Sequence, residues 1–151
     1  MATFCIANKP SVSGVRILVV DDNAPFREFI CSMLRKRAEF QVIGEASDGL
    51  EAVHKAEELL PDIILLDIGL PSLNGIEAAR RICKLGLKSK IIFVSQECSP
   101  DVVHCALSLG AMGYVAKPKA GSDLLAAVEA VIQGNQFVSA GLKHQVRTDM
   151  E

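Results

Sequence analysis

Asp62-Ile63-Ile64-Leu65-Leu66-Asp67, followed directly by Ile68-Gly69-Leu70-Pro71, is the stretch of sequence that decides the fold of this chain. Four consecutive aliphatic residues between polar and turn residues are typical of a strand that is buried on both faces, as in the middle of a parallel sheet. In open α/β sheets, ligands bind just beyond the carboxyl ends of the strands. Asp67 ends this strand and is therefore a candidate reactive group, although for Asp67 alone a turn or capping role is the commoner explanation.

Similar apolar segments alternate with helical patterns on both sides of this strand. Further strands are predicted by apolar, β-branched runs at 15–20, 40–46, 90–94 and 113–116. Helices are predicted where apolar residues recur at helical spacing after a capping residue or proline. The five predicted helices begin near Asn23, Asp48, Ile76, Pro100 and Ser122. This alternation indicates an α/β protein with a parallel sheet, helices on both faces and right-handed crossovers.

Length and composition restrict the class of protein. The 151 residues suit one domain with a real core, and 50% hydrophobic and 23% charged residues are typical of a globular protein. No apolar run approaches the roughly 20 residues that a membrane-spanning helix needs. The formal net charge of -2 argues against a nucleic-acid-binding surface in this segment. Five cysteines without CxxC spacing fit a reducing cytoplasm better than a disulfide framework or a zinc site.

The sequence divides into one domain and two flanking segments. Residues 1–14 are polar and mixed, lack the pattern of a signal peptide, and are interpreted as a flexible leader. Residues 15–134 contain all the predicted strands and helices. Residues 135–151 are mostly polar and are interpreted as a linker or tail.

Polar residues with complementary chemistry stand at the carboxyl ends of four predicted strands. In chain order, they are Asp21 and Asp22, Asp67, Ser95, and Lys117. All these strand ends lie on one edge of a parallel sheet, so we expect the side chains to converge. Three neighbouring carboxylates repel one another unless a cation neutralises them, and oxygen ligands suit Mg²⁺. A carboxylate nucleophile, a magnesium ion, an ammonium and a hydroxyl are the groups that phosphoryl transfer to an aspartate requires.

With these residues identified, residues 15–134 resemble the receiver domain of two-component response regulators. The resemblance implies a flavodoxin-like (βα)5 doubly wound sheet with strand order 2-1-3-4-5. It also implies that Asp67 is the phosphoacceptor, that Lys117 and Ser95 assist it, and that Ser95 and Tyr114 are switch residues.

The same resemblance implies a magnesium cofactor and a special peptide bond. Asp21 and Asp22 match the acidic metal-binding pair, which would bind Mg²⁺ together with Asp67 and the backbone carbonyl of Gly69. Lys117 precedes Pro118, and the family implies a cis peptide bond there, an isomer that is accessible before proline.

The function that the resemblance implies is that of a cytoplasmic phosphoacceptor switch rather than an enzyme in its own right. A sensor histidine kinase would phosphorylate Asp67, and the surface formed by the helix at 100–110, the strand at 113–116 and the helix at 122–134 would change. Homodimers are plausible through these two helices, or through the helix that begins near Asn23 and the one at 122–134. The chain would assist its own phosphorylation and dephosphorylation.

The segment 132–139 adds a narrower resemblance. Ile132-Gln133-Gly134-Asn135-Gln136-Phe137-Val138-Ser139 is similar to the end of receivers in the NarL/FixJ (LuxR-type) group, where a linker leads to a helix-turn-helix domain. We expect DNA binding to belong to such an output domain, not to this segment, which would bind no nucleic acid and no membrane.

Three alternatives remain open at this stage. Gln96 stands where the family usually has a small residue, so a pseudo-receiver that binds partners without being phosphorylated is the main alternative. For a receiver that is phosphorylated, Glu97 and Gly69 occupy the variable positions that tune dephosphorylation in the family. A magnesium-dependent phosphatase with an aspartyl nucleophile ranks low, because Gly69 stands where those enzymes have a second acid. A flavin-binding protein ranks lower still, because acids and no phosphate-binding loop follow the first strand.

Overall fold

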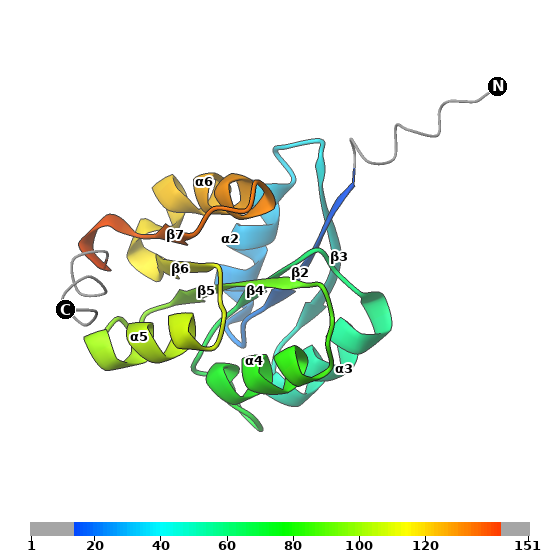
Figure 1. Ribbon diagram of the computed structural model, residues 1–151. Coiled ribbons are helices and arrows are strands. Elements are labelled where there is room, and N and C mark those ends of the chain that lie inside the picture. Colours follow the sequence, from blue (N-terminus) through cyan, green and yellow to red (C-terminus); the bar gives the residue numbers. More distant parts are fainter. Residues whose placement is uncertain (1–13, 143–151) are drawn as a thin grey trace.

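The computed structural model describes residues 14–142, which form a six-stranded, all-parallel sheet flanked by helices (Figure 1). The strands are β2 (Val15–Val20), β3 (Phe40–Ala46), β4 (Ile63–Leu66), β5 (Lys90–Ser95), β6 (Gly113–Ala116) and β7 (Phe137–Val138). Their order across the sheet is β3-β2-β4-β5-β6-β7. The first five strands therefore have the predicted order 2-1-3-4-5, and the flavodoxin-like α/β fold is confirmed.

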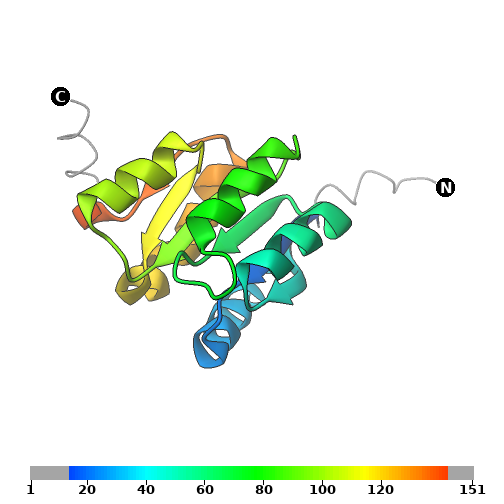
Figure 2. The same ribbon diagram turned by 90° about the horizontal axis from the view of Figure 1, so that it is seen from below.

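Within residues 14–142, five α-helices cover the two faces of the sheet. They are α2 (Ala24–Leu34), α3 (Gly49–Leu59), α4 (Gly75–Lys84), α5 (Pro100–Ser108) and α6 (Ala120–Ile132). Helices α2 and α6 lie on one face, and α3, α4 and α5 cross the other, as Figure 2 shows from below. Side-chain oxygens cap the amino ends of the first four helices by accepting main-chain N–H groups. The capping residues are Asn23, Asp48, Asn74 and Ser99.

The core consists of two apolar layers, one on each face of the sheet. Alternating residues of β2 divide between the layers: Ile17 and Val19 pack on the side of α2 and α6, and Leu18 and Val20 on the other. All four residues of β4 are buried, as the continuous aliphatic run predicted. Because both faces of the central strands are covered, their carboxyl ends are held rigidly at one edge of the sheet.

The described chain differs from the sequence prediction in the elements that follow β6. The sheet continues past Gly134, where a tail was expected: Phe137 and Val138 form β7 and pair with β6. Helix α6 begins at Ala120, before the predicted Ser122. The leader expected at 1–14 lies, except for Gly14, outside the described residues, as do residues 143–151 of the tail.

None of the helices within residues 14–142 combines the length and the apolar character needed to cross a membrane.

Candidate functional site

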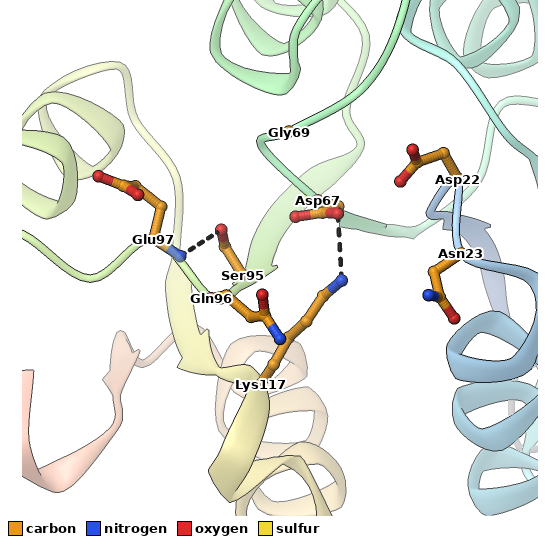
Figure 3. Close-up of a pocket in the computed structure, with 8 residues that line it drawn as sticks. All are labelled: Asp22, Asn23, Asp67, Gly69, Ser95, Gln96, Glu97 and Lys117. Atoms are coloured by element: carbon orange, nitrogen blue, oxygen red, sulfur yellow. Dashed lines mark hydrogen bonds and ion pairs between the residues drawn. The ribbon is translucent and has the colours of Figure 1, made fainter.

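The predicted site residues do converge at the carboxyl edge of the sheet. Asp21 and Asp67 directly follow the neighbouring strands β2 and β4, and the Asp67 N–H donates to the carbonyl of Val20 at 3.1 Å. Ser95 ends β5, and Lys117 follows β6. Three of them, Asp67, Ser95 and Lys117, border a pocket of about 360 Å³. Its lining residues are Asp22, Asn23, Asp67, Gly69, Ser95, Gln96, Glu97 and Lys117 (Figure 3).

A lysine placed between two buried carboxylates forms the centre of the site. Lys117 Nζ lies 2.9 Å from Asp21 Oδ2 and 3.2 Å from Asp67 Oδ2. Asp21 and Asp67 are only 2% and 6% exposed, so solvent compensates little of their charge. The second oxygen of each carboxylate accepts a main-chain N–H, from Asn23 for Asp21 and from Ile68 for Asp67. One ammonium thus serves two carboxylates that would otherwise repel each other.

The pKa shifts follow from this arrangement. Burial raises the pKa of Asp21 above its ordinary value, and the Asn23 N–H and Lys117 offset part of that effect. Burial disfavours the charged form of Lys117, but its hydrogen bond to Asp21 and the charge of Asp67 outweigh burial, so the pKa of Lys117 is raised. Lys117 therefore remains an ammonium at neutral pH and can neutralise anionic oxygens in the pocket.

The third carboxylate completes a group that fits a divalent cation. Asp21, Asp22 and Asp67 each offer an oxygen, and these oxygens lie within 4.8 Å of one another. Asp22 is exposed to solvent, whereas the other two are buried. Mg²⁺ prefers a few carboxylate oxygens and keeps several waters, which an open pocket allows. The donor set fits magnesium, and Gly69, whose main-chain carbonyl was the predicted fourth protein ligand, borders the same pocket.

Ser95 and Tyr114 both contact the main chain of Glu97. Ser95 Oγ accepts the N–H of Glu97 at 3.0 Å, and the hydroxyl of Tyr114 donates to the carbonyl of Glu97. Tyr114 is completely buried, and its ring lies 6.0 Å from that of Phe93 on the neighbouring strand. Burial raises the pKa of its hydroxyl, which therefore stays a proton donor at physiological pH. The main chain of Glu97 thus links Ser95 at the pocket to Tyr114 in the core.

The peptide bond before Pro118 is trans, which corrects the predicted cis bond; the described residues contain no cis peptide. Pro118 lies inside a single 3₁₀ turn, Lys117–Lys119. The fixed φ of proline suits such a turn, and the trans isomer is the more stable one before proline. Lys117 still reaches both carboxylates through its long, flexible side chain.

Two residues of α2 belong to the site but were not singled out from the sequence. The ring of Phe26 lies 4.6 Å from Lys117 Nζ, a cation–π distance. Arg27 donates to the carbonyl of Asp21 at 2.6 Å and pairs with Glu45 at 2.9 Å. The available signal was their position in the first turn after Asn23, directly beside the acidic pair.

The sequence of residues 17–129 matches the response regulator receiver domain family, and the chain belongs to this family. The match covers most of the described domain and includes every predicted site residue from Asp21 to Lys117. The family resemblance inferred from the strand-end residues is therefore confirmed.

Relatives and solved structures include members of the NarL/LuxR group. The transcriptional regulatory protein LiaR of Bacillus subtilis is 35% identical over 120 residues, which cover 80% of this chain and 57% of LiaR. The chemotaxis protein CheY of Thermotoga maritima is 39% identical over 118 residues, covering 78% of this chain and 98% of CheY. A LuxR-family response regulator from Aurantimonas sp. SI85-9A1 has a TM-score of 0.84 and 30% identity, covering 89% and 96% of the two chains.

The chain spans 31% to 57% of the length of the first three curated relatives it matches. The first of these is a protein-glutamate methylesterase/protein-glutamine glutaminase, and the next two are transcriptional regulatory proteins. The family assignment therefore defines the receiver domain and not the activity of a longer protein.

Proposed function

We propose that this chain is a phosphoacceptor switch, phosphorylated on Asp67 by a sensor histidine kinase in the presence of Mg²⁺. The observation that carries the proposal is the contact of Lys117 Nζ with the oxygens of both Asp21 and Asp67 at the edge of a pocket. A buried carboxylate beside a retained ammonium and two further acids has the groups needed for phosphoryl transfer.

The chemistry assigned to this chain is a displacement at phosphorus. The Asp67 carboxylate attacks, a P–O bond forms, and the P–N bond to the kinase imidazole breaks, so that the imidazole leaves and takes up a proton. The Lys117 ammonium neutralises charge on the phosphoryl oxygens. Asp21, Asp22, Asp67 and the Gly69 carbonyl would hold magnesium, which when bound supplies further positive charge beside those oxygens.

The switch part of the proposal concerns Ser95 and Tyr114. The phosphoryl group would recruit the Ser95 hydroxyl, which now accepts the Glu97 N–H. Loss of that contact would change the position of the Glu97 main chain, whose carbonyl accepts the Tyr114 hydroxyl. We assign the buried position of Tyr114 to the phosphorylated form. Phosphorylation would then change the relative populations of two conformations of the surface formed by α5, β6 and α6.

Beryllofluoride with Mg²⁺, followed by NMR, tests this function, because the complex mimics an aspartyl phosphate. Amide shifts are expected around Asp67, Ser95 and Tyr114, and none are expected without magnesium. The variant Asp67→Asn should show no such shifts. Absence of shifts in the wild-type chain would reject the phosphoacceptor function.

A pseudo-receiver is the second candidate, and Gln96 is the observation that favours it. Its side chain borders the pocket through which a phosphoryl donor must enter. Labelling with acetyl phosphate separates the two functions: a phosphoacceptor becomes labelled on Asp67, and a pseudo-receiver does not. In a phosphoacceptor, Gln96→Ala should accelerate labelling by about threefold, which is under 1 kcal/mol of barrier.

The biological setting follows from the relatives and is also proposed. We infer that the chain acts in the cytoplasm, where a sensor kinase is its partner. The longer protein would regulate transcription through an output domain, as the names of relatives such as LiaR indicate for those proteins. A homodimer would form through α5 and α6 or through α2 and α6, and this segment would not itself contact DNA.

A further inference from the structure

Ser139 is a buried polar residue outside the candidate site. Within residues 14–142, the polar or charged side chains classed as buried are those of Asp21, Asp67, Ser95 and Ser139. The first three belong to the candidate site, whereas Ser139 directly follows β7 and is 1% exposed. Burial of a hydroxyl is unfavourable unless hydrogen bonds compensate it, so its partners indicate what holds it there.

Three hydrogen bonds connect Ser139 to β6 and α6. Its hydroxyl donates to Asp123 Oδ2 at 2.8 Å and accepts the N–H of Ala116 at 3.2 Å. Its own N–H donates to the carbonyl of Tyr114 at 3.0 Å. Asp123 lies in the first turn of α6, so the hydroxyl joins α6, the end of β6 and the end of β7. We call Ser139 and Asp123 the C-terminal clamp.

The C-terminal clamp contacts the strand β6, which carries Tyr114 and ends directly before Lys117. Ala116, which donates to the Ser139 hydroxyl, is directly followed by Lys117. Tyr114 pairs with Val138 in the sheet, and it shares one core cluster with Val138 and Leu142. A movement at the end of β6 therefore has to move Phe137–Leu142 as well, or break the clamp.

The form of the contact allows it to open separately from the sheet. The ladder between β6 and β7 pairs Gly113 with Phe137 and Tyr114 with Val138, and the pairing stops there. Beyond it, a side-chain hydroxyl and not a main-chain carbonyl accepts the Ala116 N–H. Such a contact can break through rotation of one serine side chain, with the main-chain ladder intact.

We propose that the C-terminal clamp couples the phosphorylation state of Asp67 to the segment Phe137–Leu142, through Tyr114 on β6 and Lys117 directly after it. The proposal rests on the proposed phosphoacceptor function. The clamp is closed where Tyr114 is buried, so it favours the form assigned above to the phosphorylated state. Coupling between two sites is reciprocal, and the clamp must therefore change the affinity of the pocket for a phosphoryl mimic.

The experiment uses the 151-residue chain, beryllofluoride and Mg²⁺. In the wild type, the amides of Phe137–Leu142 should shift together with those around Asp67 as beryllofluoride is added. Ser139→Ala should weaken beryllofluoride binding by about threefold or more, near the lower end of typical allosteric couplings. Asp123→Ala should have a similar effect, and the double variant should add little, because both substitutions open the same contact.

Ser122→Ala is the matched control. Its hydroxyl also contacts Asp123, at 3.2 Å, but it is exposed and does not reach β6 or β7. It should bind beryllofluoride like the wild type.

The outcomes separate the clamp from the function on which it rests. If the wild type does not bind beryllofluoride, the phosphoacceptor function fails. If it binds but Phe137–Leu142 do not shift, or if Ser139→Ala binds as tightly as Ser122→Ala, the coupling is overturned. The wild-type shifts decide the question alone should Ser139→Ala not fold.

Discussion

Asp62 and Asp67 flank the same strand, β4, yet their surroundings differ completely. Asp62 is exposed, and its Oδ2 accepts the N–H of Arg16 at 2.8 Å at the amino end of β2. Asp67 is 6% exposed, and its Oδ2 pairs with Lys117. At the amino end of β4 the Asp62 carboxylate accepts a main-chain N–H of the neighbouring strand. At the carboxyl end the Asp67 carboxylate pairs with the side chain of Lys117, which can move away.

The cations at the two ends of the sheet show the same difference. Arg16 donates to the carbonyls of Leu59 and Leu60 at the end of α3, at 2.9 and 2.7 Å. Lys117 contacts the carboxylates of Asp21 and Asp67. Arg16 satisfies fixed main-chain groups, whereas Lys117 balances charges that a ligand could also balance. Polar side chains at the amino end of the sheet thus form hydrogen bonds that stabilise the fold. Those at the carboxyl end form ion pairs that a bound cation or anion could replace.

The largest expected effect concerns the two carboxylates of β4. We predict that Asp67→Asn abolishes labelling by acetyl phosphate, because no nucleophilic carboxylate remains, and that Asp62→Asn is labelled like the wild type. Intact-mass spectrometry measures both. Labelling of Asp67→Asn at the wild-type rate would show that the nucleophile is another residue. Asp67 and Asp62 would then not differ in function.

The second prediction compares the two cations. In metal-free buffer, Lys117→Met should lower the free energy of unfolding by about 1–3 kcal/mol, because two buried carboxylates lose their partner. Added Mg²⁺ should restore most of this loss by binding the folded state. Urea denaturation with and without magnesium measures the effect.

Arg16→Met is the matched variant for this prediction. It should cost about 1 kcal/mol through lost hydrogen bonds, and magnesium should restore none of it. Equal rescue of both variants would mean that magnesium stabilises the chain away from the acidic group.

Most of the fold and the members of the site could be predicted from the sequence, for physical reasons. Continuous aliphatic runs such as Ile63–Leu66 allow few alternatives to buried strands, and Asn23 and Asp48 cap the helices as predicted. Once the strands are parallel, topology alone brings Asp21, Asp67 and Lys117 to one edge.

The features that escaped prediction depend on tertiary contacts. Phe137 and Val138 are too short a run to predict a strand, and they become one because β6 offers an unpaired edge. A helical pattern gives the face of a residue but not its partner, so the contact of Phe26 with Lys117 could not be derived. The isomer before Pro118 is likewise set by the turn that contains it.

The third prediction concerns the exposed member of the acidic group. Asp22→Asn should weaken magnesium binding by about tenfold, because one anionic oxygen ligand is lost from the set. Glu28→Gln, an exposed carboxylate further along α2, should leave it unchanged. Isothermal titration calorimetry measures both affinities. Equal losses in the two variants would indicate attraction by net charge and not coordination at the carboxyl edge.

The smallest expected effect concerns the ring that faces Lys117. The rings of Phe26 and Phe29 are neighbours on α2, with centroids 5.8 Å apart. The Phe26 ring makes the cation–π contact with Lys117. Phe26→Leu should slow labelling by acetyl phosphate about two- to fivefold, the rate equivalent of a cation–π contact of about 0.5–1 kcal/mol. Phe29→Leu should not slow it, and Phe26→Tyr should retain the wild-type rate. If Phe26→Leu and Phe29→Leu react alike, the Phe26 ring does not help to position the Lys117 ammonium. The carboxylates of Asp21 and Asp67 would then hold Lys117 alone, whereas main-chain carbonyls hold Arg16.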